Sequence, residues 1–179
     1  MKTKTESRNG HQVRTKAKRL LVPVDFSDPS FLALRHAIDL AEDFGGATLT
    51  ILYVVPADSG WLNIGREEFQ DLDRSLQKQA GDELRALART HVPPTVHANL
   101  EVRIGRPAEE IAAAATEAKS DVIVLSTHGR TGLDRYLIGS VAERVMRLSP
   151  CPVFLIPASQ KRQKRESTRT AALRTKDRA

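Results

Sequence analysis

The chain has 179 residues, of which 40% are hydrophobic and 28% charged, a composition typical of one globular domain with additional terminal segments. No apolar run approaches the roughly 20 residues of a membrane-spanning helix, so we expect no membrane span. The basic N-terminus lacks the apolar segment of a secretory signal. Cys151 is the one cysteine, which excludes an internal disulfide and favours a cytoplasmic protein.

The net charge of +6 is unevenly distributed along the chain, because the first 19 and the last 20 residues each carry +6 and the middle carries −6. Neither end shows apolar periodicity. We therefore expect a disordered basic arm at 1–17, an acidic folded domain at 18–158 and a disordered basic tail at 159–179. The alternative to simple solvation is contact of these ends with nucleic acid or an anionic membrane. Because neither end contains an aromatic side chain for stacking on bases, solvation is favoured.

The first predicted elements are a buried strand and an amphipathic helix. The apolar run RLLVPVDF (19–26) indicates the strand. Ser27 followed by Asp28-Pro29 is typical of a helix start, with a capping side chain and then proline in the first turn. Gly45-Gly46 ends this helix. Proline is rare in a central strand, so we expect Pro23 where the hydrogen-bond ladder ends or bulges, beside a ligand site.

The rest of the domain continues the alternation of strands and helices. Further strands are predicted at 47–55, 96–104, 121–127 and 152–157, with helices at 67–90, from Pro107, and after residue 140, the last with Val141, Val145 and Leu148 facing inward. The third strand alternates apolar and polar residues, with Leu100 on its apolar face, so we expect it at the margin of the sheet. This order predicts a parallel sheet with helices on both faces.

Two strand ends carry the chemistry of a binding site. The first strand ends in Asp25, and the fourth leads into the glycine-rich stretch STHGRTGLDRYLIGS (126–140). In an open α/β sheet, ligands bind beyond the carboxyl ends of the strands, where the winding direction reverses. We expect Ser140 to cap the next helix, whose free N–H groups attract anions, and Arg130 to add positive charge. The stretch indicates a phosphate site, although it contains neither the P-loop nor the Rossmann glycine pattern.

Three segments resemble the universal stress protein family, in the right order and spacing over about residues 18–158. They are PVDFS (23–27), STHGRTGLDRYLIGSVAERV (126–145) and SPCPVFLIP (149–157). Nucleotide-binding members of that family carry G-x2-G-x9-G-[ST]. Gly129, Gly139 and Ser140 match the last three elements of this pattern, and Ser126 stands in place of its first glycine.

The resemblance implies a doubly wound α/β fold with a five-stranded parallel sheet in the order 3-2-1-4-5. It implies a stress-response regulatory protein that binds ATP, with Mg²⁺ carried by the phosphates. Asp25 and Val54 would lie at the adenosine end, and Ser126, Gly129, Gly139, Ser140 and Val141 along the phosphates; Pro23 and Arg130 complete the predicted site. It also implies a homodimer through strand 152–157, whose uncharged apolar run would otherwise form an exposed edge.

Several alternatives remain open. Asp25 has a structural alternative, which is to cap the turn that follows it. A homodimeric interaction module without nucleotide is a second function, with Ser126 as the mark of lost binding. An adenylyl-transferring enzyme is a third, but no nucleophile, base or Walker-type lysine is identifiable, so we expect no catalytic residue. The histidines show no metal-ligand spacing, so we expect no metal site.

Overall fold

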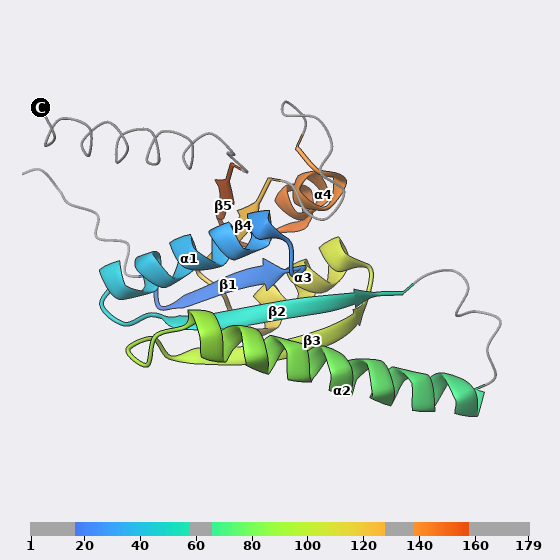
Figure 1. Cartoon of the computed structure of the whole chain (residues 1–179). Coiled ribbons are helices and arrows are strands. Elements are labelled where there is room, and N and C mark those ends of the chain that lie inside the picture. The colour runs from blue at the N-terminus through green and yellow to red at the C-terminus, as the bar shows by residue number, and fades with distance from the viewer. Residues whose placement is uncertain (1–16, 58–65, 128–137, 158–179) are drawn as a thin grey trace, which may run out of the picture.

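The computed structural model describes residues 17–57, 66–127 and 138–157, in which strands and helices alternate as predicted (Figure 1). The elements are β1 (Arg19–Val24), α1 (Asp28–Asp43), β2 (Thr48–Pro56), α2 (Arg66–His91), β3 (Ala98–Gly105), α3 (Pro107–Glu117), β4 (Val122–Ser126), α4 (Ser140–Leu148) and β5 (Val153–Ile156).

All five strands form one parallel sheet in the order β3-β2-β1-β4-β5, which confirms the predicted fold class. From β1 the chain adds β2 and β3 on one side, then crosses back to add β4 and β5 on the other. The winding direction therefore reverses between β1 and β4, and this boundary is the place where α/β sheets of this kind bind ligands. The third strand lies at an edge of the sheet, as its alternating pattern predicts.

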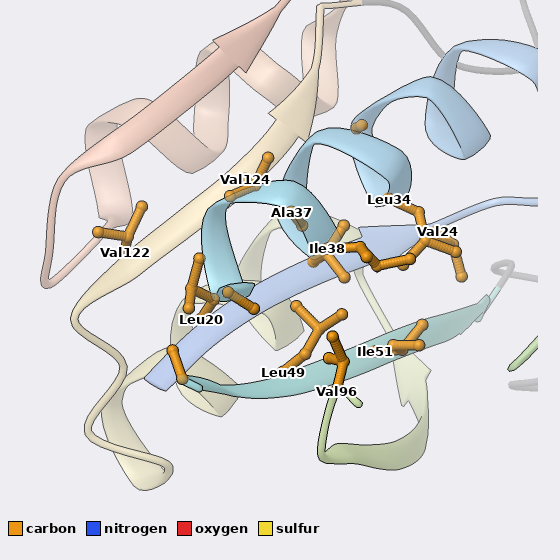
Figure 2. Packing of buried hydrophobic residues seen from close by; sticks show 14 of the residues in the cluster. Leu20, Val24, Leu34, Ala37, Ile38, Leu49, Ile51, Val96, Val122 and Val124 are labelled. Atoms are coloured by element: carbon orange, nitrogen blue, oxygen red, sulfur yellow. The ribbon is translucent and has the colours of Figure 1, made fainter. Parts of the chain in front are cut away.

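Helices cover both faces of the sheet and bury a separate apolar cluster on each. α1 and α2 pack on one face, and α3 and α4 on the other (Figure 1). Figure 2 shows side chains of α1, Leu34, Ala37 and Ile38, meeting strand residues such as Leu20 and Leu49. The spacing of these α1 residues places them on one stripe of the helix. Each fully buried leucine stabilises the folded state by about 1.5–3 kcal/mol relative to an exposed one. The two clusters together therefore hold the sheet, and with it the strand ends, in place.

The boundaries of α1 follow the predicted signals. Ser27 is its N-cap and accepts a hydrogen bond from the Ser30 backbone N–H at 3.4 Å, and proline occupies the first turn. After the helix, Gly45 and Gly46 adopt φ angles of 80° and 91°. This left-handed conformation strains residues with a side chain, which explains why two glycines end the helix.

The predicted inward faces of two elements are partly wrong. In α4 the buried residues are Ala142 and Val145, whereas Val141 is 39% and Leu148 44% exposed. The helix places the small Ala142 in the apolar cluster of this face, which leaves Val141 and Leu148 outside the cluster. In β3, Leu100 is 39% exposed although its apolar neighbours pack inward, because an edge strand has a neighbour on one side only.

The start of β1 is fixed by a carboxylate that precedes β4. Oδ2 of Asp121 accepts hydrogen bonds from the backbone N–H groups of Lys18 at 2.8 Å and Arg19 at 2.9 Å, and the Arg19 side chain lies 3.5 Å from Oδ1. Ala17, which lies within the predicted basic arm, is 2% exposed and packs in the apolar cluster on the face that α1 and α2 cover. The folded domain therefore includes Ala17.

We predict that the contribution of Asp121 to stability disappears in acid. The hydrogen bond from the Lys18 backbone N–H is the largest influence on the Asp121 carboxyl and lowers its pKa; burial opposes it, and the Arg19 backbone N–H lowers the pKa further, so the net shift is downward. Because the folded-state pKa is depressed, this stabilisation is present above the unfolded-state pKa and is lost as the pH falls below about 4. Urea unfolding should show Asp121→Asn less stable than wild type at pH 7, with the difference shrinking toward pH 2. A difference that is constant with pH would contradict this assignment.

Candidate functional site

The hydrogen-bonded ladder between β1 and β4 ends before the carboxyl ends of these strands. Within the described residues the ladder between them pairs Leu20 with Val122 and Leu21 with Ile123 and goes no further, whereas the ladder between β1 and β2 continues to Val24. Pro23 lies beyond the last β1–β4 pair and has no N–H to donate, so this ladder ends there. The expectation that Pro23 marks the end of a ladder is confirmed, whereas its expected place beside a ligand site stays a prediction.

Three strand ends and one helix start meet at this edge of the sheet. Asp25 follows β1 directly, and continuing the β1–β2 register by one residue places it level with Val54, which is 7% exposed. Thr127 follows β4, and its carbonyl accepts a hydrogen bond from the Gly139 N–H at 2.8 Å. The start of α4 is thereby held against the end of β4.

Asp25 is half-buried and takes part in the turn that leads into α1. Its Oδ1 accepts hydrogen bonds from the Ser27 N–H at 3.1 Å and the Ser27 hydroxyl at 2.5 Å. The Ser30 hydroxyl donates to the Ser27 carbonyl at 2.8 Å and lies 3.3 Å from the Asp25 N–H, which donates to it. Asp25 therefore does cap the turn that follows it, which is the structural alternative to a binding role. These hydrogen bonds also fix the Asp25 carboxylate at the edge of the sheet, where a ligand-binding role would require it.

Phe26 is a feature of this turn that the sequence did not reveal. Its φ of 62° is left-handed, which costs a residue with a side chain about 1 kcal/mol or more. Its ring packs on Tyr53 of β2, with ring centroids 4.7 Å apart, and this contact offsets part of the strain. No glycine or asparagine at the position signals the conformation. The strained backbone lies between Asp25 and the cap of α1, so it sets the direction in which the chain leaves β1.

Gly139, not Ser140, is the N-cap of α4. The Gly139 backbone is extended, with φ −60° and ψ 149°, and its carbonyl accepts the first helical hydrogen bond from the Glu143 N–H at 2.9 Å. Ser140 is the first helical residue, is exposed and makes no capping bond, so its predicted role as cap is wrong. The φ of Gly139 is ordinary, so its backbone conformation does not by itself require glycine. The first N–H groups of α4 therefore lack a side-chain cap, and such groups attract anions.

The other predicted site residues lie at the same edge where the structure describes them. Ser126 is the last residue of β4, is 6% exposed and pairs with Ile156 of β5. Val141 follows Ser140 in the first turn of α4. Gly129 and Arg130 lie outside the described residues. The described members of the predicted site are Pro23, Asp25, Val54, Ser126, Gly139, Ser140 and Val141.

Among the described residues, the remaining reactive side chains provide no competing site. The Cys151 thiol is half-buried, and burial raises its pKa, which disfavours the reactive thiolate form. In the part of the chain that the structure describes, no group of three or more His, Cys, Asp or Glu side chains is arranged to hold a metal ion. Among the same residues, no helix combines the length and the apolar character needed to cross a membrane.

A family model described as the universal stress protein family matches residues 16–157. The chain belongs to the universal stress protein family. Universal stress protein MJ0531 of Methanocaldococcus jannaschii is 37% identical over 155 residues, which cover 86% of this chain and 88% of the relative. The solved structure of MJ0577, from the same organism, has a TM-score of 0.70 and 25% identity and covers 82% of this chain and 99% of its own.

Two solved universal stress proteins that share the fold carry nucleotides. One was determined in complex with cAMP, with a TM-score of 0.51, 22% identity, and coverage of 80% of this chain and 98% of its own. The other, from Archaeoglobus fulgidus, was determined in complex with dAMP, with a TM-score of 0.50, 20% identity, and coverage of 77% of this chain and 96% of its own.

Proposed function

We propose that this universal stress protein binds ATP, in the cytoplasm, as a regulatory ligand rather than as the substrate of a dedicated enzyme. The observation that carries the proposal is the reversal of winding direction between β1 and β4, beside a helix start whose cap, Gly139, has no side chain. A triphosphate needs several donors at close range, and helix N–H groups supply them together with the positive end of the helix dipole. The cAMP and dAMP complexes of two family members support an adenine nucleotide as the ligand class.

The described residues fit such a ligand. The N–H groups of Ser140 and Val141 at the start of α4 would hold phosphate oxygens. Asp25 would accept hydrogen bonds from the nucleoside, and the apolar Val54 would cover one side of it. The phosphates would bring Mg²⁺ with them, since no carboxylate cluster of the described site is arranged to hold the ion alone. Ser126 keeps its backbone N–H in place of the family glycine, so we retain ATP binding over the alternative of a module that has lost it.

Analysis of co-purified nucleotide tests this proposal directly. The protein is purified without added nucleotide and denatured, and the released small molecules are identified by mass spectrometry. We expect ATP, in an amount that is a substantial fraction of the protein, and much less from a Gly139→Val variant prepared in parallel. Protein free of nucleotide that also fails to bind added ATP would favour the interaction module.

We also propose that the protein is a homodimer paired through β5. β5 is an edge strand with no charged residue, and Phe154 is 42% exposed on it. An uncharged apolar edge pairs readily with another strand, and covering it with a second copy removes the risk of aggregation. The opposite edge differs, because β3 carries Glu101 and Arg103, and charged side chains discourage pairing.

Replacing Phe154 with lysine should convert the dimer into a folded monomer. The side chain is exposed in the single chain, so lysine fits there without loss of the core, but its charge opposes strand pairing. Leu100→Lys is a matched control, because Leu100 is 39% exposed on the other edge strand. Analytical ultracentrifugation at micromolar concentration should show monomer for the first variant and dimer for the second. Wild type that sediments as a monomer would refute the β5 dimer.

A further inference from the structure

A groove of about 460 Å³ lies between α1 and β5, on the side of the molecule away from α2 and β3. Its lining residues are His36, Asp39, Leu40 and Asp43 from α1 and Val153, Phe154, Leu155 and Ile156 from β5. One wall is thus a helix with two carboxylates, and the other is an apolar edge strand. The nucleotide site proposed above uses neither wall.

The chemistry of this groove suits lysine and arginine side chains. Asp39 and Asp43 lie one helical turn apart and are both exposed, and neither has an ion pair or hydrogen bond with another side chain in the described ranges. Phe154 presents an aromatic face at 42% exposure. A long basic side chain lays its hydrocarbon stem on apolar surface, places its charge over an aromatic ring and ends at a carboxylate. The groove offers all three kinds of contact together.

A segment with this chemistry follows the groove in the sequence. β5 ends at Ile156, which itself lines the groove, and residues 160–179 carry eight Lys or Arg against two acidic residues. The nearest basic stretch is QKRQKR (160–165). Lys161 is five residues beyond Ile156, a distance of up to about 17 Å along an extended chain. This length lets the chain turn back along the strand it has just left.

We propose that residues 160–165 dock in the α1–β5 groove of their own chain, with basic side chains on Asp39 and Asp43. Because only a short linker separates residues 160–165 from the end of β5, weak contacts are sufficient for docking. A short linker gives an effective concentration in the millimolar range, so a segment that would bind with a Kd of about 1 mM when detached is about half-docked when attached. The −6 charge of the domain outside the ends adds a favourable field for a basic segment.

Docking of the tail is compatible with the proposed β5 dimer because the two use different parts of the strand. Strand pairing uses the backbone edge of β5, whereas the tail would lie over side chains that face α1. If the second copy filled the groove instead, the carboxylates of α1 would contact that copy and the tail would be excluded. The experiment therefore has to distinguish a tail from the same chain, a tail from another chain and no tail in the groove.

Zero-length carbodiimide cross-linking of the full-length protein at low salt makes this distinction. We expect amide links from Lys161 or Lys164 to Asp39 or Asp43, and none above background to Asp82 or Glu83, which are exposed carboxylates on α2. A mixture of isotopically light and heavy protein shows whether each link lies within one chain. Links between chains only, links spread evenly over exposed carboxylates, or no links to α1 would each overturn the proposal.

A pair of variants gives a readout that does not depend on the cross-linking chemistry. Asp39→Asn combined with Asp43→Asn should speed tryptic cleavage after Arg162 and Arg165 severalfold at low salt, because the tail loses its docking site. Asp82→Asn combined with Glu83→Gln removes the same charge from α2 and should leave the rate at the wild-type value. High salt should raise the wild-type rate to that of the groove variant. Equal cleavage of the groove variant and wild type, with both folded by circular dichroism, would contradict the docked tail.

Discussion

Replacing Gly139 with valine is expected to weaken ATP binding by about 100-fold, or about 2.7 kcal/mol, while the domain stays folded. The backbone of Gly139, at φ −60° and ψ 149°, is a conformation that valine adopts readily. The variant therefore introduces no backbone strain, and losing glycine at the cap costs only about 1 kcal/mol of stability. We expect its branched side chain, however, to block the approach of phosphate oxygens to the N–H groups at the start of α4. Isothermal titration calorimetry, with thermal unfolding to confirm the fold, measures both effects.

Ser140→Ala is the matched control for this site. Because Ser140 is the first helical residue and not the cap, its hydroxyl contributes at most one hydrogen bond to a bound phosphate. Loss of one such bond corresponds to about 1 kcal/mol, so affinity should fall severalfold and stability should hardly change. If Gly139→Val bound ATP as tightly as wild type, the phosphates would have to lie elsewhere.

Leu52→Ala should produce a large loss of stability, about 2–5 kcal/mol. Leu52 lies on β2 between two other strands and is fully buried in the cluster beneath α3. Truncation removes apolar contacts and leaves a cavity that the packed sheet cannot close. Leu100→Ala is the same chemical change on β3, where the side chain is 39% exposed, and it should cost less than about 1 kcal/mol. Urea unfolding of both variants tests the pair, and equal losses would show that the cluster under α3 is not the core described above.

The order of the elements could be predicted because each carries a local signal. The β1 segment is apolar on both faces, as a central parallel strand must be, and Ser27 followed by proline marks the start of α1. The orientation of α4 had no comparable signal. Val141, Val145 and Leu148 form an acceptable apolar stripe, but so do Ala142 and Val145, and the small alanine allows the closer approach to the sheet. Packing, not periodicity, decides between two such stripes.

The location of the candidate site could also be predicted, but its internal geometry could not. Strand order and the rule for ligand sites at reversal points place Asp25 and the loop after β4 together. Sequence signals place the cap of α4 one residue too late, because glycine and serine are both acceptable caps and stand side by side at Gly139 and Ser140. The left-handed φ of Phe26 occurs together with a ring contact to Tyr53, a residue distant in the sequence. Only the folded structure reveals such a contact.

Calorimetric titration of ATP and Mg²⁺ into the nucleotide-free wild-type protein is the most direct test of the proposed function. The site built from β1, β4 and α4 predicts saturable binding of one ATP per chain, and the same or higher affinity in Ser126→Gly, which restores the family glycine. Absence of binding in the folded wild type would contradict the proposal. Recovery of binding in Ser126→Gly alone would then identify the chain as a family member whose site has lost its nucleotide through that one position.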